Sequence, residues 1–230
     1  MKIFIVSVLS VCFFVSCNTD DMLSNTNVNN MNSHPGIVMK SLNSPANSTN
    51  SFDYVGDLQL DVLTAYVQNY SGSALLSYVV PNVNTTTANN SGFNTISTGY
   101  SGLNTTDAQW VVNNVSDLTK MMNKTTMSTG GKTQMSNFIS MLEGFKNQAF
   151  ANTYASITSF ESTITGNSTL TSLDKQVILS TTSTARYLIA YECNGGGRGW
   201  NKTKAGIMAS INNDDAAAVT TSLMTNIVVQ

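Results

Sequence analysis

The chain has few of the residues that usually build chemical sites. It holds one histidine, His34, three prolines and three cysteines, and only 10% of its 230 residues are charged. A single histidine excludes zinc patterns built on paired histidines and leaves Ser-His or Cys-His catalysis with one candidate base. His34 lies in a segment rich in Asn and Ser, where we expect a solvated side chain. The sequence therefore predicts no catalytic residues, no metal site and no cofactor.

The cysteines do not describe a disulfide framework. Cys12 lies within an N-terminal apolar run and Cys17 follows that run, so Cys193 stands alone in the rest of the sequence. One cysteine cannot form an internal cross-link. The fold must therefore be stabilised by a core, for which the 41% of hydrophobic residues is sufficient.

Positive charge is also scarce. The formal net charge is -2 at pH 7, and the chain contains no block of Lys and Arg. Nucleic-acid binding requires such a basic footprint, so we expect no nucleic-acid partner. Because an average domain has about 25% charged residues, solubility here must come from the many Asn, Thr and Ser residues.

The N-terminus has the pattern of a secretory signal. Lys2 supplies a positive charge, and residues 3–15 are apolar except for Ser7 and Ser10. A transmembrane helix needs about 20 apolar residues, whereas the apolar core of a signal has about 7–15. The pattern predicts a signal peptide over residues 1–16.

The end of this run resembles a bacterial lipoprotein signal. It reads Phe14-Val15-Ser16-Cys17, and in lipoproteins such a cysteine is lipidated and becomes the new N-terminus. The acidic Asn18-Thr19-Asp20-Asp21 is similar to the surface-export tag of Bacteroidota lipoproteins. The resemblance implies acyl chains such as palmitate on Cys17, attachment to the bacterial outer membrane and exposure at the cell surface. Each chain adds about 0.8 kcal/mol per buried methylene. An ordinary signal cleaved near Cys17 is the alternative.

Residues 17–50 are predicted to be a disordered tether behind the lipid. The segment is polar, contains Pro35 and Pro45, and has little apolar patterning. Such a composition cannot bury enough apolar surface to offset its ordering entropy. We therefore expect residues 18–50 to be dispensable for folding, and the domain to occupy residues 51–230.

The domain is predicted to be all-α. Val55, Leu58, Val62 and Tyr66 recur at three- and four-residue steps, and no segment shows sustained alternation. This period indicates an irregular helical bundle of about five to seven helices. Residues 73–80 fit either a helical turn or a strand, and residues 82–106 are expected to form a long loop. Further stripes begin at Trp110, Met135, Tyr154, Leu173, Trp200 and Val219. Residues 123–129 are expected to end the stripe from Trp110, and Arg186 lies off the face that begins at Leu173. Side-chain caps are predicted at Thr106, at Thr171 with Asp174, and at Asn213-Asp214.

The acidic residues allow several interpretations. Asp53, Asp57 and Asp61 share one helix face, where they could bind a cation or remain solvated. The solvated face is favoured because no further ligand cluster lies nearby in sequence. Carboxylate-pair hydrolysis is also open, since the aspartates could pair in space with the glutamates of the domain. These glutamates are Glu143, Glu161 and Glu192.

Two glycine-rich segments share features with phosphate-binding patterns. Gly130-Gly131-Lys132-Thr133 resembles the end of a phosphate-binding loop, but Thr126 occupies a position where that motif requires glycine. We therefore predict an interhelical turn there. The segment 194–199 is predicted to be a hinge between two helices. An anion nest before a helix near Trp200 is the alternative, and it would use Gly195, Gly196, Gly197 and Arg198.

The domain resembles a set of uncharacterised exported helical lipoproteins of the Bacteroidota type. The resemblance rests on Phe52-Asp53-Tyr54-Val55-Gly56, on Ser183-Thr184-Ala185-Arg186-Tyr187 and on Gly199-Trp200. Members often carry a histidine in the first helix, whereas this chain has Gln59-Leu60. The resemblance implies no particular activity.

Three functions remain open. The favoured one is a non-enzymatic interaction or structural module on a membrane anchor at Cys17, with a protein or glycan partner. The alternatives are a carboxylate-dependent hydrolase acting on glycans and an immunity-type protective lipoprotein.

Overall fold

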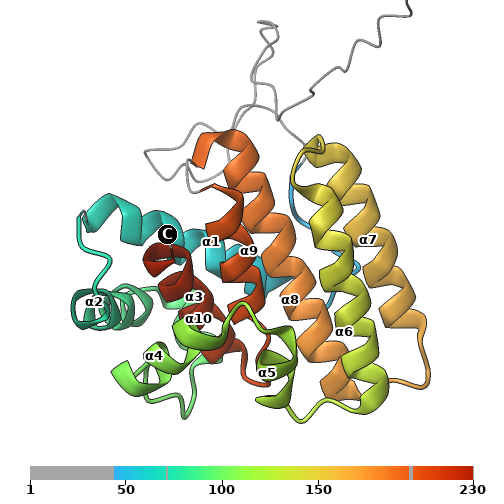
Figure 1. Ribbon diagram of the computed structural model, residues 1–230, viewed down its shortest axis with the longest axis horizontal. Helices are drawn as coiled ribbons and strands as arrows, with labels where there is room; N and C mark the ends of the chain where they lie inside the picture. The colour runs from blue at the N-terminus through green and yellow to red at the C-terminus, as the bar shows by residue number, and fades with distance from the viewer. Residues whose placement is uncertain (1–43, 71, 197–198, 230) are drawn as a thin grey trace, which may run out of the picture.

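The structure is a computed structural model that describes residues 44–70, 72–196 and 199–229. Within these ranges the chain is helical and has no strand, as Figure 1 shows, which confirms the all-α prediction. The described residues form ten α-helices rather than the five to seven expected. The helices are α1 (Asp53–Asn69), α2 (Leu76–Ala88), α3 (Ser91–Ile96), α4 (Thr105–Asn114), α5 (Leu118–Asn123), α6 (Thr129–Leu142), α7 (Phe150–Gly166), α8 (Ser172–Tyr191), α9 (Trp200–Ala209) and α10 (Asp215–Val228), with short turns η1 (Glu143–Phe145) and η2 (Glu192–Gly196).

Helix α8 is the centre of the bundle. It lies between the α6–α7 pair and α9 in Figure 1, and it also contacts α1 and α10. Every residue from Val177 to Tyr191 is buried. The prediction that only one face of this helix is buried, with Arg186 off that face, is therefore wrong.

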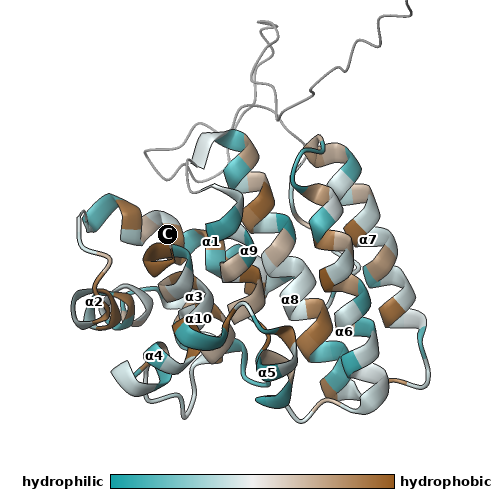
Figure 2. Cartoon of the chain, in the orientation of Figure 1, coloured by the Kyte–Doolittle hydropathy of each residue, from teal (hydrophilic) through white to brown (hydrophobic). Residues whose placement is uncertain are grey.

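Small polar side chains allow α8 to be buried on all sides. Its Ser and Thr residues give the pale stretches along α8 in Figure 2. Their hydroxyls find acceptors locally or across an interface, as when Ser183 Oγ donates to the Asp53 carbonyl at 2.8 Å. At Gly56, α1 comes so close to α8 that a Cβ atom would lie 2.6 Å from the Ser183 carbonyl oxygen.

Helix α10 is a second centre. It contacts α1, α2, α3, α4 and α9. All of its residues except Ala217, Ile227 and Val228 are buried, including several with polar side chains. Thr220 Oγ1 donates to the Ala216 carbonyl at 3.0 Å, and Thr221 Oγ1 donates to the Ala209 carbonyl of α9 at 2.8 Å. The hydroxyls of Thr220 and Thr221 are thus satisfied within the core, where unpaired groups would be costly.

Many helices begin at a side-chain cap. The capping box of Thr171 and Asp174 and the cap at Asp214 are as predicted. The predicted cap at Thr106 lies instead at Asn104, whose side chain accepts from the Asp107 amide. Other caps of this kind are Asn90, Asp117 and Ser128. The abundance of Asn, Ser and Asp therefore sets helix starts.

Two segments predicted to be irregular are helical. Most of residues 82–106 belongs to α2, α3 and the start of α4, so the long loop is not present. Residues 73–80, which allowed two interpretations, enter α2 at Leu76. Gly130 and Gly131 lie in the first turn of α6, not in a turn between helices, and Ser128 Oγ accepts from the Gly131 amide at 3.1 Å.

The last part of the predicted tether belongs to the domain. Residues 44–50, here named the N-terminal strap, pack on α1, α7 and α8. Asn47 is 8% exposed and Asn50 is 3% exposed. Tyr154 of α7 donates from its hydroxyl to the Ala46 carbonyl at 2.8 Å. The domain therefore begins near Ser44, while the signal at 1–16, Cys17 and the rest of the predicted tether lie outside the described residues.

Candidate functional site

The largest cluster of charged groups in the described residues surrounds Arg186, whose side chain is completely buried. Arg186 Nε donates to Glu161 Oε1 at 3.1 Å. The guanidinium also donates to the Asp53 carboxylate and to the Pro45 carbonyl of the N-terminal strap. One arginine thus joins α8, α7, α1 and the strap. A buried guanidinium is tolerated only with such partners.

The Glu161 carboxylate is occupied by further donors. Asn47 Nδ2 lies 2.6 Å from Oε2, and Asn50 Nδ2 and Thr182 Oγ1 each lie 2.8 Å from Oε1. Because Arg186 adds a fourth donor, the carboxylate is fixed as an acceptor in a closed site. The structure does bring two of the candidate carboxylates, Asp53 and Glu161, to one place. They hold an arginine there, whereas a glycosidase pair must face an open cleft that admits the sugar and water.

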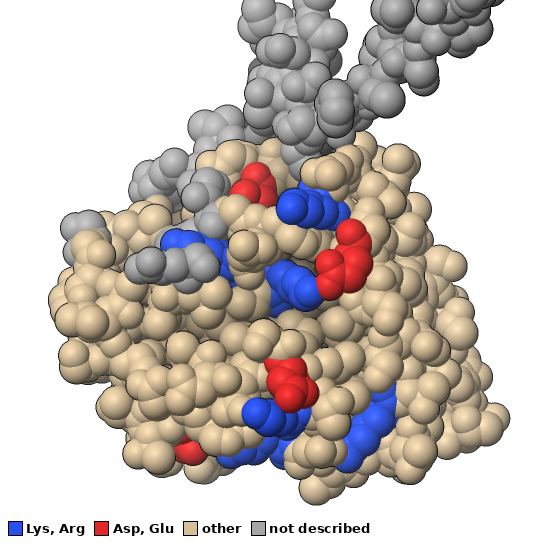
Figure 3. Space-filling view, viewed as in Figure 1, with Lys and Arg blue, Asp and Glu red and all other residues tan. Residues whose placement is uncertain are grey.

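The remaining acidic residues are distributed over the domain. Glu143 pairs with Lys204 of α9. Figure 3 shows acidic and basic side chains scattered over one face of the molecule, among mostly uncharged residues. Asp57 and Asp61 are exposed, as the solvated-face interpretation expected, while Asp53 is engaged by Arg186. Partial burial and the charges of Asp61 and Asp53 raise the pKa of Asp57. No group of three potential metal ligands occurs in the described part of the chain.

Asp174 joins two helix starts. Its carboxylate accepts from Ser128 N and Ser128 Oγ, both at 2.8 Å, and from Thr171 N at 2.9 Å. Burial raises the pKa of Asp174, but the hydrogen bonds from Ser128 and Thr171 outweigh it and hold the pKa below its usual range. Gly131 is required here because a Cβ atom would overlap the Asp174 carboxylate. The glycines that resemble a phosphate loop thus pack against a carboxylate.

The glycine segment after α8 is only partly described. Gly197 and Arg198, two of the four candidate anion-binding residues, lie outside the described residues. Gly195 has a φ of 85° and Gly199 a φ of 80°, which glycine adopts readily. The Gly199 amide donates to Glu192 Oε1 at 2.9 Å. This amide of the segment therefore already holds a carboxylate of the protein.

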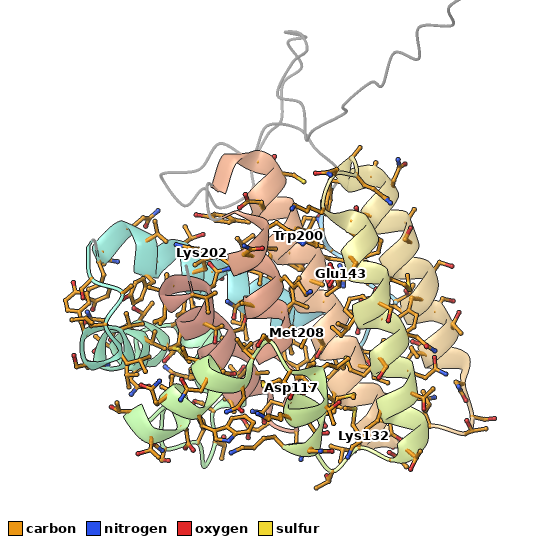
Figure 4. The ribbon with its side chains drawn as sticks, viewed as in Figure 1. Asp117, Lys132, Glu143, Trp200, Lys202 and Met208 are labelled. Carbon is orange, nitrogen blue, oxygen red and sulfur yellow. The ribbon has the colours of Figure 1, made fainter. Side chains whose placement is uncertain are left out.

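One cavity adjoins this partly described segment at Glu192, Cys193 and Trp200. It has a volume of about 300 Å³ and lies between η1 and the start of α9. Figure 4 shows Trp200 at the start of α9, in the region of Glu143. The cavity is lined by Phe145, Lys146, Asn147, Ile189, Glu192, Cys193 and Trp200. Residues 197–198, which lie in sequence between the lining residues Cys193 and Trp200, are outside the described residues, so this cavity carries no site assignment.

A second cavity, here named the Trp110 pocket, is walled by described residues. It has a volume of about 280 Å³ and lies where α4 and α5 meet the end of α9 and the start of α10. Two aromatic rings, apolar side chains and a few polar groups line it. The lining residues are Tyr100, Gly102, Leu103, Asp107, Trp110, Val111, Met121, Lys124, Ala209, Ile211, Asn212, Ala217 and Thr221.

The aromatic residues of the Trp110 pocket are held in different ways. Tyr100 is fixed by a 2.6 Å hydrogen bond between its hydroxyl and Thr220 Oγ1, and by an edge contact with Phe93. Burial raises the pKa of Tyr100, and the charges of Asp214 and Asp107 raise it further against the Thr220 hydrogen bond. The ammonium of Lys124 lies over the Trp110 ring, at a distance of 4.2 Å from the ring centroid.

Two polar side chains of the pocket can still form an ion pair or donate a hydrogen bond to a ligand. Lys124 forms no ion pair with a described carboxylate. Asn212 Oδ1 accepts from the Asp214 amide at 3.1 Å, while its Nδ2 donates to no protein group among the described residues. Aromatic surface, an apolar floor and uncommitted polar groups are the usual composition of a small-ligand site.

Sequence reasoning did not identify this pocket. Trp110 was assigned to a core stripe, and Lys124 was placed in the segment that ends the same stripe. The pocket joins residues from 100–124 to residues from 209–221. Nothing in the periodicity of either segment signals that they meet.

Comparisons with known proteins give no match. The chain matches no family model, no curated protein and no solved structure. Within the described residues, no helix has both the length and the apolar character needed to cross a membrane.

Proposed function

We propose that this protein is a lipoprotein anchored in the bacterial outer membrane through Cys17 and exposed at the cell surface. Its domain acts as a non-enzymatic interaction module, and the Trp110 pocket is its ligand contact. The N-terminal charge, the apolar run and the Ser16-Cys17 junction support the anchor. The single observation that carries the binding role is the combination of aromatic rings and uncommitted polar groups in one cavity.

Three buried or partly buried carboxylates already bind other groups of the protein, which favours a binding role over hydrolysis. Asp53 and Glu161 hold Arg186, and Asp174 holds the starts of α6 and α8. In contrast, Lys124 and Asn212 lie at the Trp110 pocket without a carboxylate or carbonyl partner of their own. Ligand pockets usually measure about 300–1,000 Å³, so a cavity of about 280 Å³ suits one chemical group of a larger partner.

The anchor is tested by fractionating cells that produce the full-length protein or its Cys17→Ala variant. We expect the parent protein in the outer-membrane fraction, with the mass of an acylated N-terminal cysteine and with sensitivity to protease added to intact cells. The variant should lack the acyl mass and leave the membrane fraction. An unchanged mass and distribution would refute the anchor.

The binding role is tested by ligand-observed NMR. The soluble domain is mixed with neutral sugars, small carboxylates and organic ammonium ions, and saturation transfer is compared with that of the Trp110→Ala variant. We expect at least one class to bind the parent and to lose binding in the variant. Tyr78→Ala is the matched control, since Tyr78 is 37% exposed on α2 and lies outside the pocket. If no class distinguishes Trp110→Ala from the parent, the pocket is not the ligand contact.

A further inference from the structure

The side chain that lies over Trp110 indicates what the pocket can hold. Lys124 Nζ is 4.2 Å from the ring centroid, within the range of a cation–π contact. Lys120, one turn earlier on α5, instead lies 3.9 Å from Asp117, which Figure 4 labels at the start of that helix. The two lysines thus have different partners. The ammonium of Lys124 uses an aromatic face where that of Lys120 uses a carboxylate.

The surroundings of the ring also favour positive charge. Asp107 lines the same pocket, and Asp214 starts α10 beside Asn212. Both carboxylates lie near enough to Tyr100 to raise the pKa of its hydroxyl through their charge. Two aromatic rings with nearby carboxylates form the surroundings in which organic ammonium groups are recognised in proteins.

We propose that the Trp110 pocket binds a small organic ammonium group, and that the ammonium of Lys124 occupies the ring face when this ligand is absent. The inference rests on the proposed function, in which this pocket is the ligand contact. On binding, the ligand cation takes the ring face and the Lys124 side chain moves into solvent. No covalent step is involved.

The internal contact is weak enough to be displaced. Lys124 is exposed. An exposed cation–π contact favours the lysine on the ring over the lysine in solvent by only about two- to fivefold. A protein whose binding-competent state is partly populated shows an affinity reduced by that fraction. Removing the Lys124 ammonium should therefore strengthen binding of an ammonium ligand by about two- to fivefold.

Other ligand chemistries predict different responses to the same change. A carboxylate ligand would pair with Lys124, so loss of the lysine would weaken its binding. A neutral sugar would bind by stacking and hydroxyl contacts, and its binding would not require a positive charge on the ligand. The sign of the Lys124→Met effect and the charge requirement therefore separate these classes.

The experiment uses tryptophan fluorescence. The chain has two tryptophans, so the Trp200→Phe background leaves Trp110 as the reporter. Choline chloride and tetramethylammonium chloride are titrated against sodium chloride at equal ionic strength. The neutral carbon analogue of choline, 3,3-dimethyl-1-butanol, tests the need for charge. We expect a saturable change with both cations, none with sodium, and much weaker binding of the neutral analogue.

Variants test the role of each group. Lys124→Met should lower the dissociation constant for choline about two- to fivefold, and Asp107→Asn should raise it. Lys120→Met is the matched control and should leave it unchanged, because Lys120 lies on the same helix outside the pocket. If Trp200→Phe does not fold, saturation-transfer NMR of choline on the parent and on Trp110→Ala gives the same comparison.

Three results would overturn the inference. They are the absence of saturable choline binding, equal binding of the neutral analogue, and weaker binding in Lys124→Met. If sugars or carboxylates bind in a Trp110-dependent way while choline does not, the proposed binding role stands and only the ligand class is wrong. If nothing binds, both fail.

Discussion

Replacing Arg186 by methionine is the most informative test of how the domain is held together. The substitution keeps a long, flexible side chain in the centre of the bundle but removes the cation shared by Glu161 and Asp53. Glu161 is 1% exposed and would remain as a buried carboxylate without its ion-pair partner. The strap would also lose the bond to its Pro45 carbonyl.

The expected loss can be estimated from the surroundings of Glu161. Removing one partner of a buried ion pair costs about 3–5 kcal/mol. Glu161 keeps its bonds from Asn47, Asn50 and Thr182, and Asp53 can be hydrated because 19% of its side chain is exposed. These features place the loss near the lower limit, about 3 kcal/mol. A domain of this size should then melt about 6–12 °C lower.

The assay is urea unfolding followed by circular dichroism, with hydrogen exchange of the strap as a local readout. Adding Glu161→Gln to Arg186→Met removes the unpaired charge, so the double variant should lose clearly less than the sum of the two single changes. Lys120→Met serves as the control at an exposed lysine. A loss below about 1 kcal/mol for Arg186→Met, or additive effects in the double variant, would refute this account of the cluster.

Three further predictions follow from the packing. A chain that starts at Ser51 should be less stable than one that starts at Ser44, by about 1 kcal/mol for each buried hydrogen bond of the strap that it lacks. Equal urea midpoints would contradict this. Gly56→Ala should cost at least about 1–3 kcal/mol in urea unfolding because of the close Ser183 carbonyl. Gly166→Ala, which meets no atom within 4 Å, should be neutral or stabilising by up to about 1 kcal/mol. The stabilisation from Asp174, whose pKa is lowered by folding, should be lost as the pH falls below about 4, and acid titrations of Asp174→Asn should lack this component.

The class of fold was predictable because helical periodicity survives in most of the chain. The stripe from Val55 to Tyr66 lies on the buried side of α1, and Thr171 and Asp174 form the expected cap. These features depend on neighbours within a few positions in sequence. Local spacing is therefore sufficient to indicate them.

The wrong predictions share a different physical origin. Arg186 was placed outside the core because its partners Glu161, Asp53 and Pro45 are 25, 133 and 141 positions away in sequence. The strap was assigned to a tether for the same reason, since the side-chain amides of its buried asparagines donate to groups of α7 and α8 that are distant in sequence. Residues 82–106 were expected to be a loop because Asn and Thr are common in loops, whereas here they cap helices and bond to helix carbonyls.

The candidate site was the least predictable feature. The Asn194–Gly199 segment attracted attention through its glycines, yet Gly197 and Arg198 lie outside the described residues. The Trp110 pocket has no local signature, because its residues come from ordinary helices, from helix ends and from the connection between α3 and α4. Only the packing of α4 and α5 against α9 and α10 brings its polar groups together.

The strap also determines how the domain would respond to mechanical force. A protein held by its N-terminus is pulled at the point where its chain enters the fold, and here that point is Pro45. Tension applied there passes through Arg186 into α8, and through Asn47 and Asn50 into Glu161 of α7 and the Leu179 carbonyl of α8. These bonds connect one short segment to α7 and to the central helix α8, so they share the load and must break together before α1 is peeled from α8.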